Sequence, residues 1–374
     1  MAANFDTRVE RLKARRKGTN QIAAMDAMLE STQILVNKSR QQEIWETRAA
    51  GKKATKYALG AMQEVDPVYT RVSIQTGERI ENQLAKKLDA RGLKTVYRLQ
   101  GSVPLNIHIK GVSDVDILAI DEQMLMVATA GIRYNTYPST DKDGLDVLHI
   151  LRNHVEECLA DAFPMAKVHT ENAKSVKITG GSLARDVDVV PAIWWDTVNY
   201  QQTNDEKDRG VAILNKKIPE RVYNTPFVHI NLIETRCNQS YGGLRKSIRL
   251  LKNIKADAES EGTVINLSSF DIASIMYHSD VAALSRGRFF ELAILGETQR
   301  WLDWLWHNYE EAKKLSVPDG TRKIFDSEEK KDQLLALSSQ VDNLMRAVAF
   351  EINDAFGSDT PLHEIRSYVG ASAY

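Results

Sequence analysis

Apolar residues recur at helical spacing through the N-terminal part of the chain, from about residue 5 to residue 90. Lys, Arg, Gln and Glu separate them, so each predicted helix has one apolar face and one charged face. Asp66-Pro67 interrupts the pattern, and a further helix is predicted over residues 68–88. The N-terminal part is therefore expected to be helical.

The period of the pattern changes after this helix. Alternating apolar and polar residues predict short strands, and one amphipathic run predicts a helix over residues 144–163. This middle part is expected to form a sheet, with strands over residues 95–100, 112–120, 167–170, 175–179, 186–194 and 226–233.

Helical spacing returns after Gly242-Gly243 and predicts helices over residues 244–255, 269–284, 289–309 and 328–356. Strands are thus confined to the middle of the chain, which is typical of an α+β fold. We expect two domains: a core with N-terminal helices over residues 1–235, and a helical C-terminal lobe over residues 236–374.

Composition narrows the class of protein. The chain has 374 residues and a formal net charge of -1, so the molecule as a whole carries no bulk field for nucleic acid or anionic lipid. Cys158 and Cys237 are too few for a disulfide framework or a zinc site, which favours a reducing compartment. No apolar run reaches the length of a membrane span, and we expect a cytoplasmic protein without a membrane partner.

One basic run near the N-terminus leaves a question about nucleic acid open. A charge run on a helix is usually a solvated face, but several basic groups on one surface can also contact a polyanion. The run comprises Arg8, Arg11, Lys13, Arg15, Arg16 and Lys17.

Residues 101–118, GSVPLNIHIKGVSDVDIL, carry the strongest chemical signal. If the end of this stretch is a strand, Asp114 and Asp116 share one face, while Val115 and Ile117 point into the core. Paired carboxylates repel each other unless cations lie between them, and oxygen ligands suit Mg²⁺ or Mn²⁺. Gly101 lets backbone N–H groups approach a phosphate, and the Ser102 hydroxyl can add a hydrogen bond.

A site that binds two metal ions and transfers phosphoryl groups needs a third carboxylate on a neighbouring strand. Asp186 and Asp188 share a face in DVDVVPAIW, so the sequence permits either. We favour Asp188, because valines flank it on both sides, as expected in the middle of a buried strand. Whether Asp186 assists Asp188 stays open.

A second Gly-Ser motif precedes this pair, in GGSLARDVDVV over residues 180–190. Only three residues separate Ser182 from Asp186, too few for a loop that holds a triphosphate. Gly101 and Asp114 are thirteen positions apart, which leaves room for a turn and a return. The first copy is therefore the better phosphate loop.

In this order, the motifs resemble the signature of the polymerase-β-type nucleotidyltransferases. They are most similar to the branch with 2′-5′-oligoadenylate synthetase, cyclic GMP-AMP synthase and the bacterial CD-NTases of antiphage signalling. That branch has Gly-Ser before an S-D-x-D strand, and a third carboxylate before an apolar pair and Pro-Ala. The matching residues here are Gly101, Ser102, Ser113, Asp114, Asp116 and Asp188, followed by residues 189–192. Asn106-Ile107 departs from the Gly-Thr that relatives often have at that position.

The resemblance also extends to the helical half. In the branch, a basic residue on a helix grips the donor triphosphate, and Lys252 matches it best, ahead of Arg245 and Arg249. A Ser-aromatic step that holds phosphate and stacks on the base is matched by Ser269-Phe270. The resemblance implies a mixed sheet with N-terminal helices, joined to a helical C-terminal lobe, with the active site in the cleft between them.

The function implied is synthesis of a cyclic or short linear oligonucleotide second messenger from nucleoside triphosphates, with release of pyrophosphate. The metal would be two Mg²⁺ ions, with Mn²⁺ as an alternative. The substrates would be ATP, with GTP, CTP or UTP as alternatives, the product would act on an effector, and a regulatory protein partner would be compatible with the resemblance. Two alternatives are a nucleotidyltransferase acting on RNA, tRNA or protein, and a catalytically silent nucleotide-binding scaffold.

Overall fold

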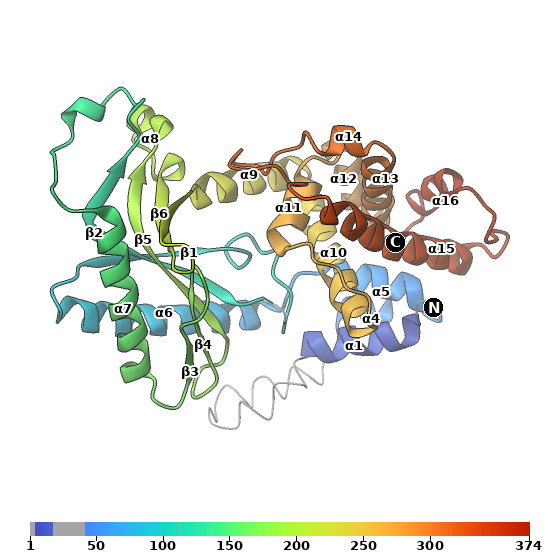
Figure 1. The fold of residues 1–374 in the computed structure, drawn as a ribbon. Coiled ribbons are helices and arrows are strands. Elements are labelled where there is room, and N and C mark those ends of the chain that lie inside the picture. Colours follow the sequence, from blue (N-terminus) through green and yellow to red (C-terminus); the bar gives the residue numbers. More distant parts are fainter. Residues whose placement is uncertain (1–3, 18–41, 112) are drawn as a thin grey trace. The chain divides into compact units, whose positions relative to one another are not determined.

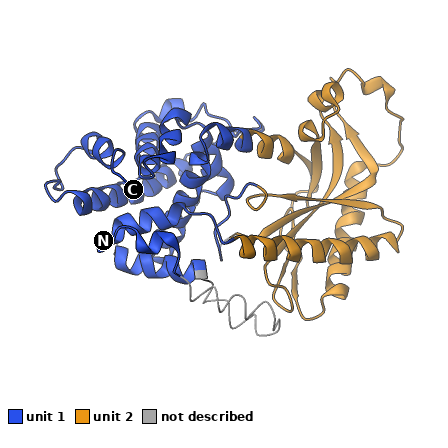
Figure 2. Ribbon diagram, turned by 180° about the vertical axis from the view of Figure 1, so that it is seen from behind, with its two compact units in different colours: residues 1–66, 105–112, 233–374 blue, residues 67–104, 113–232 orange. Residues whose placement is uncertain are grey.

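The computed structural model describes residues 4–17, 42–111 and 113–374. The chain forms two compact units (Figure 2). The sheet unit comprises residues 67–104 and 113–232, and the helical unit comprises residues 1–66, 105–112 and 233–374. The helical pattern across residues 18–41 lies outside the described residues. The chain thus leaves the sheet unit after Pro104 and returns to it at Ser113.

The sheet unit contains a mixed sheet of seven strands (Figure 1). Its order is β1-β2-β5-β4-β3, and β6 pairs with the second half of β5 and with β7. β2 and β5 are parallel, whereas the other pairs are antiparallel. The strands are β1 Thr95–Gln100, β2 Val115–Val127, β3 Lys167–His169, β4 Val176–Thr179, β5 Val187–Asp196, β6 Gly210–Asn215 and β7 Glu220–Asn224.

Two helices, α6 Pro67–Asp89 and α7 Gly144–Ala162, cover one face of this sheet. Ile80 and Leu84 of α6 and Leu151 of α7 pack in one core with Val115 and Ile117 of β2. Side chains alternate along a strand, so Asp116 and Leu118 of β2 belong to the opposite face. Asp116 therefore lies on the face away from α6 and α7.

Shorter elements complete the sheet unit. They are α8 Val198–Thr203 and the 3₁₀ turns η1 Tyr134–Thr136 and η2 Glu206–Asp208. α9 Pro226–Gln239 begins in the sheet unit and ends in the helical unit.

The helical unit packs around α5 and α10. Almost every residue of α5 is buried, from Ala54 to Met62. At Gly60 an added Cβ would lie 2.4 Å from the Trp45 ring, so this position has room only for glycine. The helices are α1 Phe5–Lys17, α4 Ile44–Thr47, α5 Lys53–Met62, α10 Gly243–Ser260, α11 Ser269–Tyr277, α12 Val281–Ser285, α13 Ala293–His307, α14 Tyr309–Ala312, α15 Glu329–Ile352 and α16 Leu362–Val369, with the 3₁₀ turn η3 Arg286–Arg288.

The predicted α+β class and most element positions are confirmed. The strand predicted over residues 226–233 is wrong, because this segment is the first half of α9. His229, Ile233 and Cys237 are buried at intervals of four residues, which is the spacing of one helical face. The sequence reading also missed β6, a continuously buried run, and β7. No helix in the described ranges is long and apolar enough to cross a membrane.

Candidate active site

Three of the predicted polar residues come together on the face of the sheet away from α6 and α7. Asp116 of β2 and Asp188 of β5 are register partners on adjacent parallel strands. Asp114 lies two residues before Asp116, immediately before β2, and its negative charge acts on the Asp188 carboxyl group. Carboxylates from two separate segments are thus neighbours, as the sequence motifs predicted.

The turn after β1 brings backbone close to this cluster. Gly101 has φ +75°, a backbone conformation that is unfavourable for residues with a side chain. An added Cβ would also lie 2.1 Å from Asp116 Oδ2. Ser102 follows Gly101 in the same turn, in the sheet unit. Only glycine therefore allows the chain to pass this carboxylate at such a short distance.

Asp188 stands in a half-buried environment. Ser175 Oγ donates a hydrogen bond to Asp188 Oδ1 at 2.7 Å. Burial raises the pKa of the Asp188 carboxyl group above its usual value, the hydrogen bond from Ser175 opposes this, and the charge of Asp114 adds to the increase. A cation near this group would relieve the repulsion between Asp114 and Asp188.

Lys177 supplies a positive charge to the cluster. Its Nζ lies 2.5 Å from Asp114 Oδ2 and 3.7 Å from Asp186 Oδ2. Burial alone would lower the pKa of the Lys177 ammonium, but the hydrogen bond to Asp114 and the charges of the surrounding aspartates outweigh it and raise the pKa. Lys177 is therefore charged at neutral pH.

A hollow of about 300 Å³ opens beside the carboxylates. Asp116 and Asp188 line it, and its volume is at the lower end of the range of small-molecule pockets. The remaining lining residues combine an apolar floor with a few polar groups: Leu118, Val190, Val211, Ile213, Gln100, Lys174, Ser175 and Asn224.

The donor set suits a hard divalent cation, since Asp114, Asp116 and Asp188 offer only carboxylate oxygens. Their positions on adjacent segments also suit shared binding of such a cation. Across the described ranges, however, no three His, Cys, Asp or Glu side chains converge into a ready-made metal cluster. Asp114 is engaged by Lys177, so a metal ion held by all three aspartates requires this contact to change.

The predicted basic residues of α10 belong to the helical unit, where they hold the segment 105–110. Arg245 Nε donates to the Leu105 carbonyl at 3.0 Å, Arg249 to the Asn106 carbonyl at 2.6 Å, and Lys252 Nζ to the Ile107 carbonyl at 3.0 Å. Burial lowers the pKa of the Arg249 guanidinium to about 10. These three side chains therefore fix the backbone that follows the Gly101-Ser102 turn in sequence.

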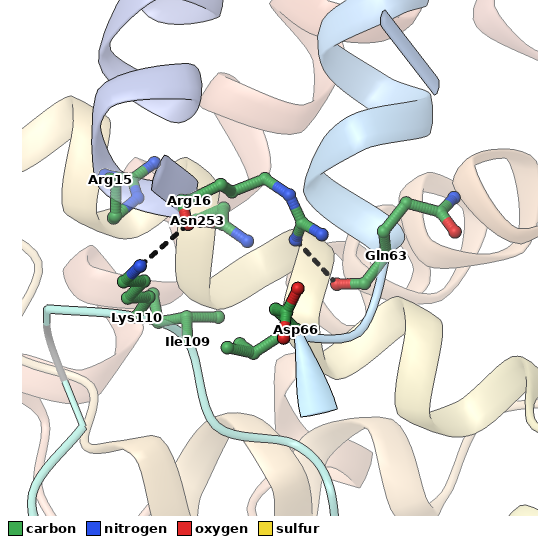
Figure 3. Close-up of a pocket in the computed structure, with 8 residues that line it drawn as sticks. Arg15, Arg16, Gln63, Asp66, Ile109, Lys110 and Asn253 are labelled. Carbon is green, nitrogen blue, oxygen red and sulfur yellow. Dashed lines mark hydrogen bonds between the residues drawn. The ribbon is translucent and has the colours of Figure 1, made fainter. Parts of the chain in front are cut away.

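Lys110, at the end of this segment, adds a further contact within the helical unit. Its Nζ donates to the Arg16 carbonyl at 3.0 Å, and the Arg16 side chain in turn donates to the Gln63 carbonyl (Figure 3). The hollow among these residues measures only about 10 Å³, which is room for about one water molecule. It is too small for a nucleotide.

Ser269 and Phe270, the predicted Ser-aromatic step, are the first two residues of α11. Ser269 is exposed, and the N-cap of the helix is the preceding residue, Ser268, which bonds reciprocally with Asp271. The Phe270 ring lies 5.4 Å from the Arg322 guanidinium. The step is thus at a capped helix N-terminus, as expected, in the helical unit.

The basic run of α1 pairs with carboxylates of the same unit. Arg15 binds Asp257 through two hydrogen bonds of 3.1 and 2.9 Å, and Arg8, only 1% exposed, binds Glu261 at 2.6 Å. Arg16 pairs with Glu43. The basic side chains of this run therefore largely bind carboxylates within the helical unit rather than facing solvent.

Comparison with known proteins places the chain in a family. A cyclic dinucleotide synthase, CdnE, from Yersinia aleksiciae is 50% identical over 93% of this chain and 93% of its own length. This chain belongs to the CD-NTases. The model of the cGAS/DncV-like nucleotidyltransferase C-terminal helical domain also matches it, over residues 231–346. A c-di-GMP synthase from Capnocytophaga granulosa is 32% identical over 76% of the chain and 85% of its own length.

A solved structure supports the same assignment of this CD-NTase. The STING-associated CdnE c-di-GMP synthase of Capnocytophaga granulosa superposes with a TM-score of 0.70 and 28% identity. The match covers 91% of this chain and 97% of that one. The predicted family, its fold and the nucleotidyltransferase class are thereby confirmed.

Two residues of the CD-NTase site were missed from the sequence, Ser175 and Lys177. A signal for Lys177 was present, because SVKIT alternates and its Val176 and Ile178 are buried on the helix-covered face. What the sequence could not supply was the pairing of β4 with β5, which brings Lys177 opposite Asp188.

Proposed function

We propose that this CD-NTase condenses nucleoside triphosphates into a cyclic dinucleotide, or a short linear oligonucleotide, and releases pyrophosphate. The product would be a second messenger in antiphage signalling of the CBASS type. The observation that carries the proposal is the pair of register partners Asp116 and Asp188 beside a hollow, in a chain half identical to a cyclic dinucleotide synthase.

We propose Asp114, Asp116 and Asp188 as ligands of two Mg²⁺ ions, for which Mn²⁺ can substitute. When bound, such ions neutralise charge on the triphosphate and acidify an attacking ribose hydroxyl. Gly101 and Ser102 would orient the phosphates through backbone N–H groups and a hydroxyl. Ser113 directly precedes the metal ligands and would support the same loop.

The reaction forms a bond between the ribose oxygen and the α-phosphorus and breaks the bond from that phosphorus to pyrophosphate. Pyrophosphate leaves with the electron pair of the broken bond. The hydroxyl proton would pass to Asp188, the half-buried carboxylate of this centre.

In the helical unit, Ser269 would hold phosphate and Phe270 would stack on a base, and the cap of α11 suits an anion. Lys252 stays a proposed ligand of the donor triphosphate, although in the structure its Nζ donates to the Ile107 carbonyl. The proposed substrates are ATP, GTP, CTP or UTP. The product would act on an effector, a regulatory protein partner would be compatible with the family, and the setting would be the cytoplasm.

The test is to incubate the full chain with Mg²⁺ or Mn²⁺ and four labelled ribonucleoside triphosphates. We expect phosphatase-resistant products whose mass is that of a cyclic dinucleotide. Mass spectrometry of the products then identifies the bases. Equal product formation by Asp114→Asn/Asp116→Asn protein would show that the proposed centre is wrong.

A further inference from the structure

The carboxylates of the candidate site form one row with a lysine across three neighbouring strands. Asp116 of β2 is the register partner of Asp188 of β5, and Asp188 is in turn the register partner of Lys177 of β4. Side chains of register partners project from the same face of a sheet. Val176 and Ile178, on either side of Lys177, are fully buried on the other face. The strand geometry therefore directs Lys177 toward the aspartates.

The ammonium group of Lys177 is closest to Asp114. The distance of 2.5 Å to Asp114 Oδ2 is that of a direct charged hydrogen bond, whereas Asp186 Oδ2 is 3.7 Å away. The Lys177 side chain is 29% exposed and that of Asp186 is 44% exposed. Lys177 thus has a second, more solvated carboxylate within a short movement of its first partner.

The same oxygen atoms cannot serve Lys177 and a divalent cation together. An ammonium group and a metal ion at one carboxylate repel each other, and the repulsion is stronger in a half-buried cluster than in water. Asp114 must therefore exchange a lysine for a metal ion if it is a metal ligand. Asp186, which we do not propose as a ligand, can accept the displaced lysine.

We propose that Lys177 is a built-in counter-ion that occupies Asp114 in the metal-free chain and transfers to Asp186 when a divalent cation binds. Lys177 is then a positioning residue that sets the metal concentration at which the site fills. This inference rests on the proposed metal role of Asp114, Asp116 and Asp188.

The experiment titrates Mn²⁺ alone into the full chain without nucleotide and follows heat of binding and thermal stabilisation. Lys177→Gln removes the competing charge, so its Mn²⁺ Kd should fall at least roughly tenfold, the lower end of what a hydrogen bond to a charged group contributes. Lys167→Gln is the control, because Lys167 is an exposed lysine on neighbouring β3 and its loss changes net charge equally. It should leave the Kd unchanged.

A double-mutant cycle tests the role of Asp186. Asp186→Asn should weaken Mn²⁺ binding in the wild-type background, because Lys177 then loses its alternative partner. In the Lys177→Gln background the same change should have a much smaller effect, since no lysine needs a new partner. Equal effects in both backgrounds would mean that Asp186 acts only through its own charge, and would overturn the transfer to Asp186.

The outcomes distinguish the counter-ion role of Lys177 from the proposed metal site itself. An unchanged or higher Kd in Lys177→Gln overturns the counter-ion role alone, whereas undetectable Mn²⁺ binding by both proteins also removes the metal site on which that role rests. Binding that persists in Asp116→Asn/Asp188→Asn protein refutes the metal site itself. If Lys177→Gln does not fold, Lys177→Arg decides: arginine grips carboxylates with two hydrogen bonds, so tighter Mn²⁺ binding by this variant contradicts the proposal.

Discussion

At the scale of single residues, Gly101 is a backbone position beside the candidate site that excludes any side chain. Its φ of +75° and the 2.1 Å from an added Cβ to Asp116 Oδ2 leave no room for a side chain. The sequence indicated glycine near phosphate but gave no hint that the crowded neighbour is a carboxylate. That contact depends on the antiparallel pairing of β1 with β2, where Gln100 is opposite Asp116.

Gly101→Ala should therefore reduce the rate of nucleotide condensation by roughly 100-fold, because displacing a reacting group by about 1 Å has effects of this size. Gly180→Ala is the matched control. Gly180 has φ +73° and nothing within 4 Å of an added Cβ. From its positive φ alone, Gly180→Ala should lose about 1 kcal/mol of stability, and it should keep its activity. Equal loss of activity in both variants would remove the special role of Gly101.

Asp188 and Lys177 show which single residues of the candidate site the sequence could and could not indicate. The preference for Asp188 over Asp186 rested on flanking valines, and the structure brings Asp188 into register with Asp116. The function of either aspartate stays a prediction. Lys177 was not singled out, because its importance depends on strand order rather than on its own neighbours in sequence.

At the scale of elements, α10 holds the segment that follows the Gly101-Ser102 turn. Arg249 is buried and donates to two carbonyls, those of Met62 and Asn106, at 2.9 and 2.6 Å. The sequence predicted the basic helix but assigned its charges to a triphosphate. Partners more than 140 positions away in the chain cannot be read from a helical pattern.

Arg249→Leu should lower the free energy of unfolding by about 2 kcal/mol, since it leaves buried carbonyls without donors. Lys255→Ala, on the same helix, is the control. Its ion pair with Glu259 is partly exposed and should contribute no more than about 0.5 kcal/mol. Urea denaturation of both variants measures the difference. A smaller loss for Arg249→Leu than for Lys255→Ala would contradict the anchoring role.

Glu291 connects α10 with the segments around α4 and α5. It accepts hydrogen bonds from Lys246 at 2.5 Å, from Gln63 at 2.9 Å and from Arg48. Burial alone would raise the pKa of this carboxyl group, but these donors hold the pKa below its usual value of 4.5. A depressed pKa stabilises the fold above the usual value, and this contribution is lost as the pH falls through the folded-state pKa.

Thermal melts between neutral pH and about pH 3 should therefore show a smaller loss of stability for Glu291→Gln than for wild type, starting from a lower value at pH 7. Glu310→Gln, at an ion pair whose glutamate is 81% exposed, should melt like wild type throughout. Identical pH dependence of Glu291→Gln and wild type would contradict the assignment.

At the scale of the whole molecule, the sequence predicted the family and the α+β class because short motifs carry the chemistry in chain order. It predicted a single domain boundary near residue 235. In the structure, residues 1–66 and residues 105–112 belong to the same compact unit as the C-terminal helices. This division of the chain depends on contacts between residues that are distant in sequence. Arg8 with Glu261 and Arg15 with Asp257 are examples that also engage the basic run considered for nucleic acid.

We propose Asp116 and Asp188 as the catalytic centre of a cyclic oligonucleotide synthase. The most direct measurement is pyrophosphate release from nucleoside triphosphates by wild type and by Asp188→Asn, with circular dichroism to confirm the fold of both. We expect release by wild type and a loss of at least roughly 1,000-fold in the variant. Release by a folded Asp188→Asn protein at the wild-type rate would contradict it.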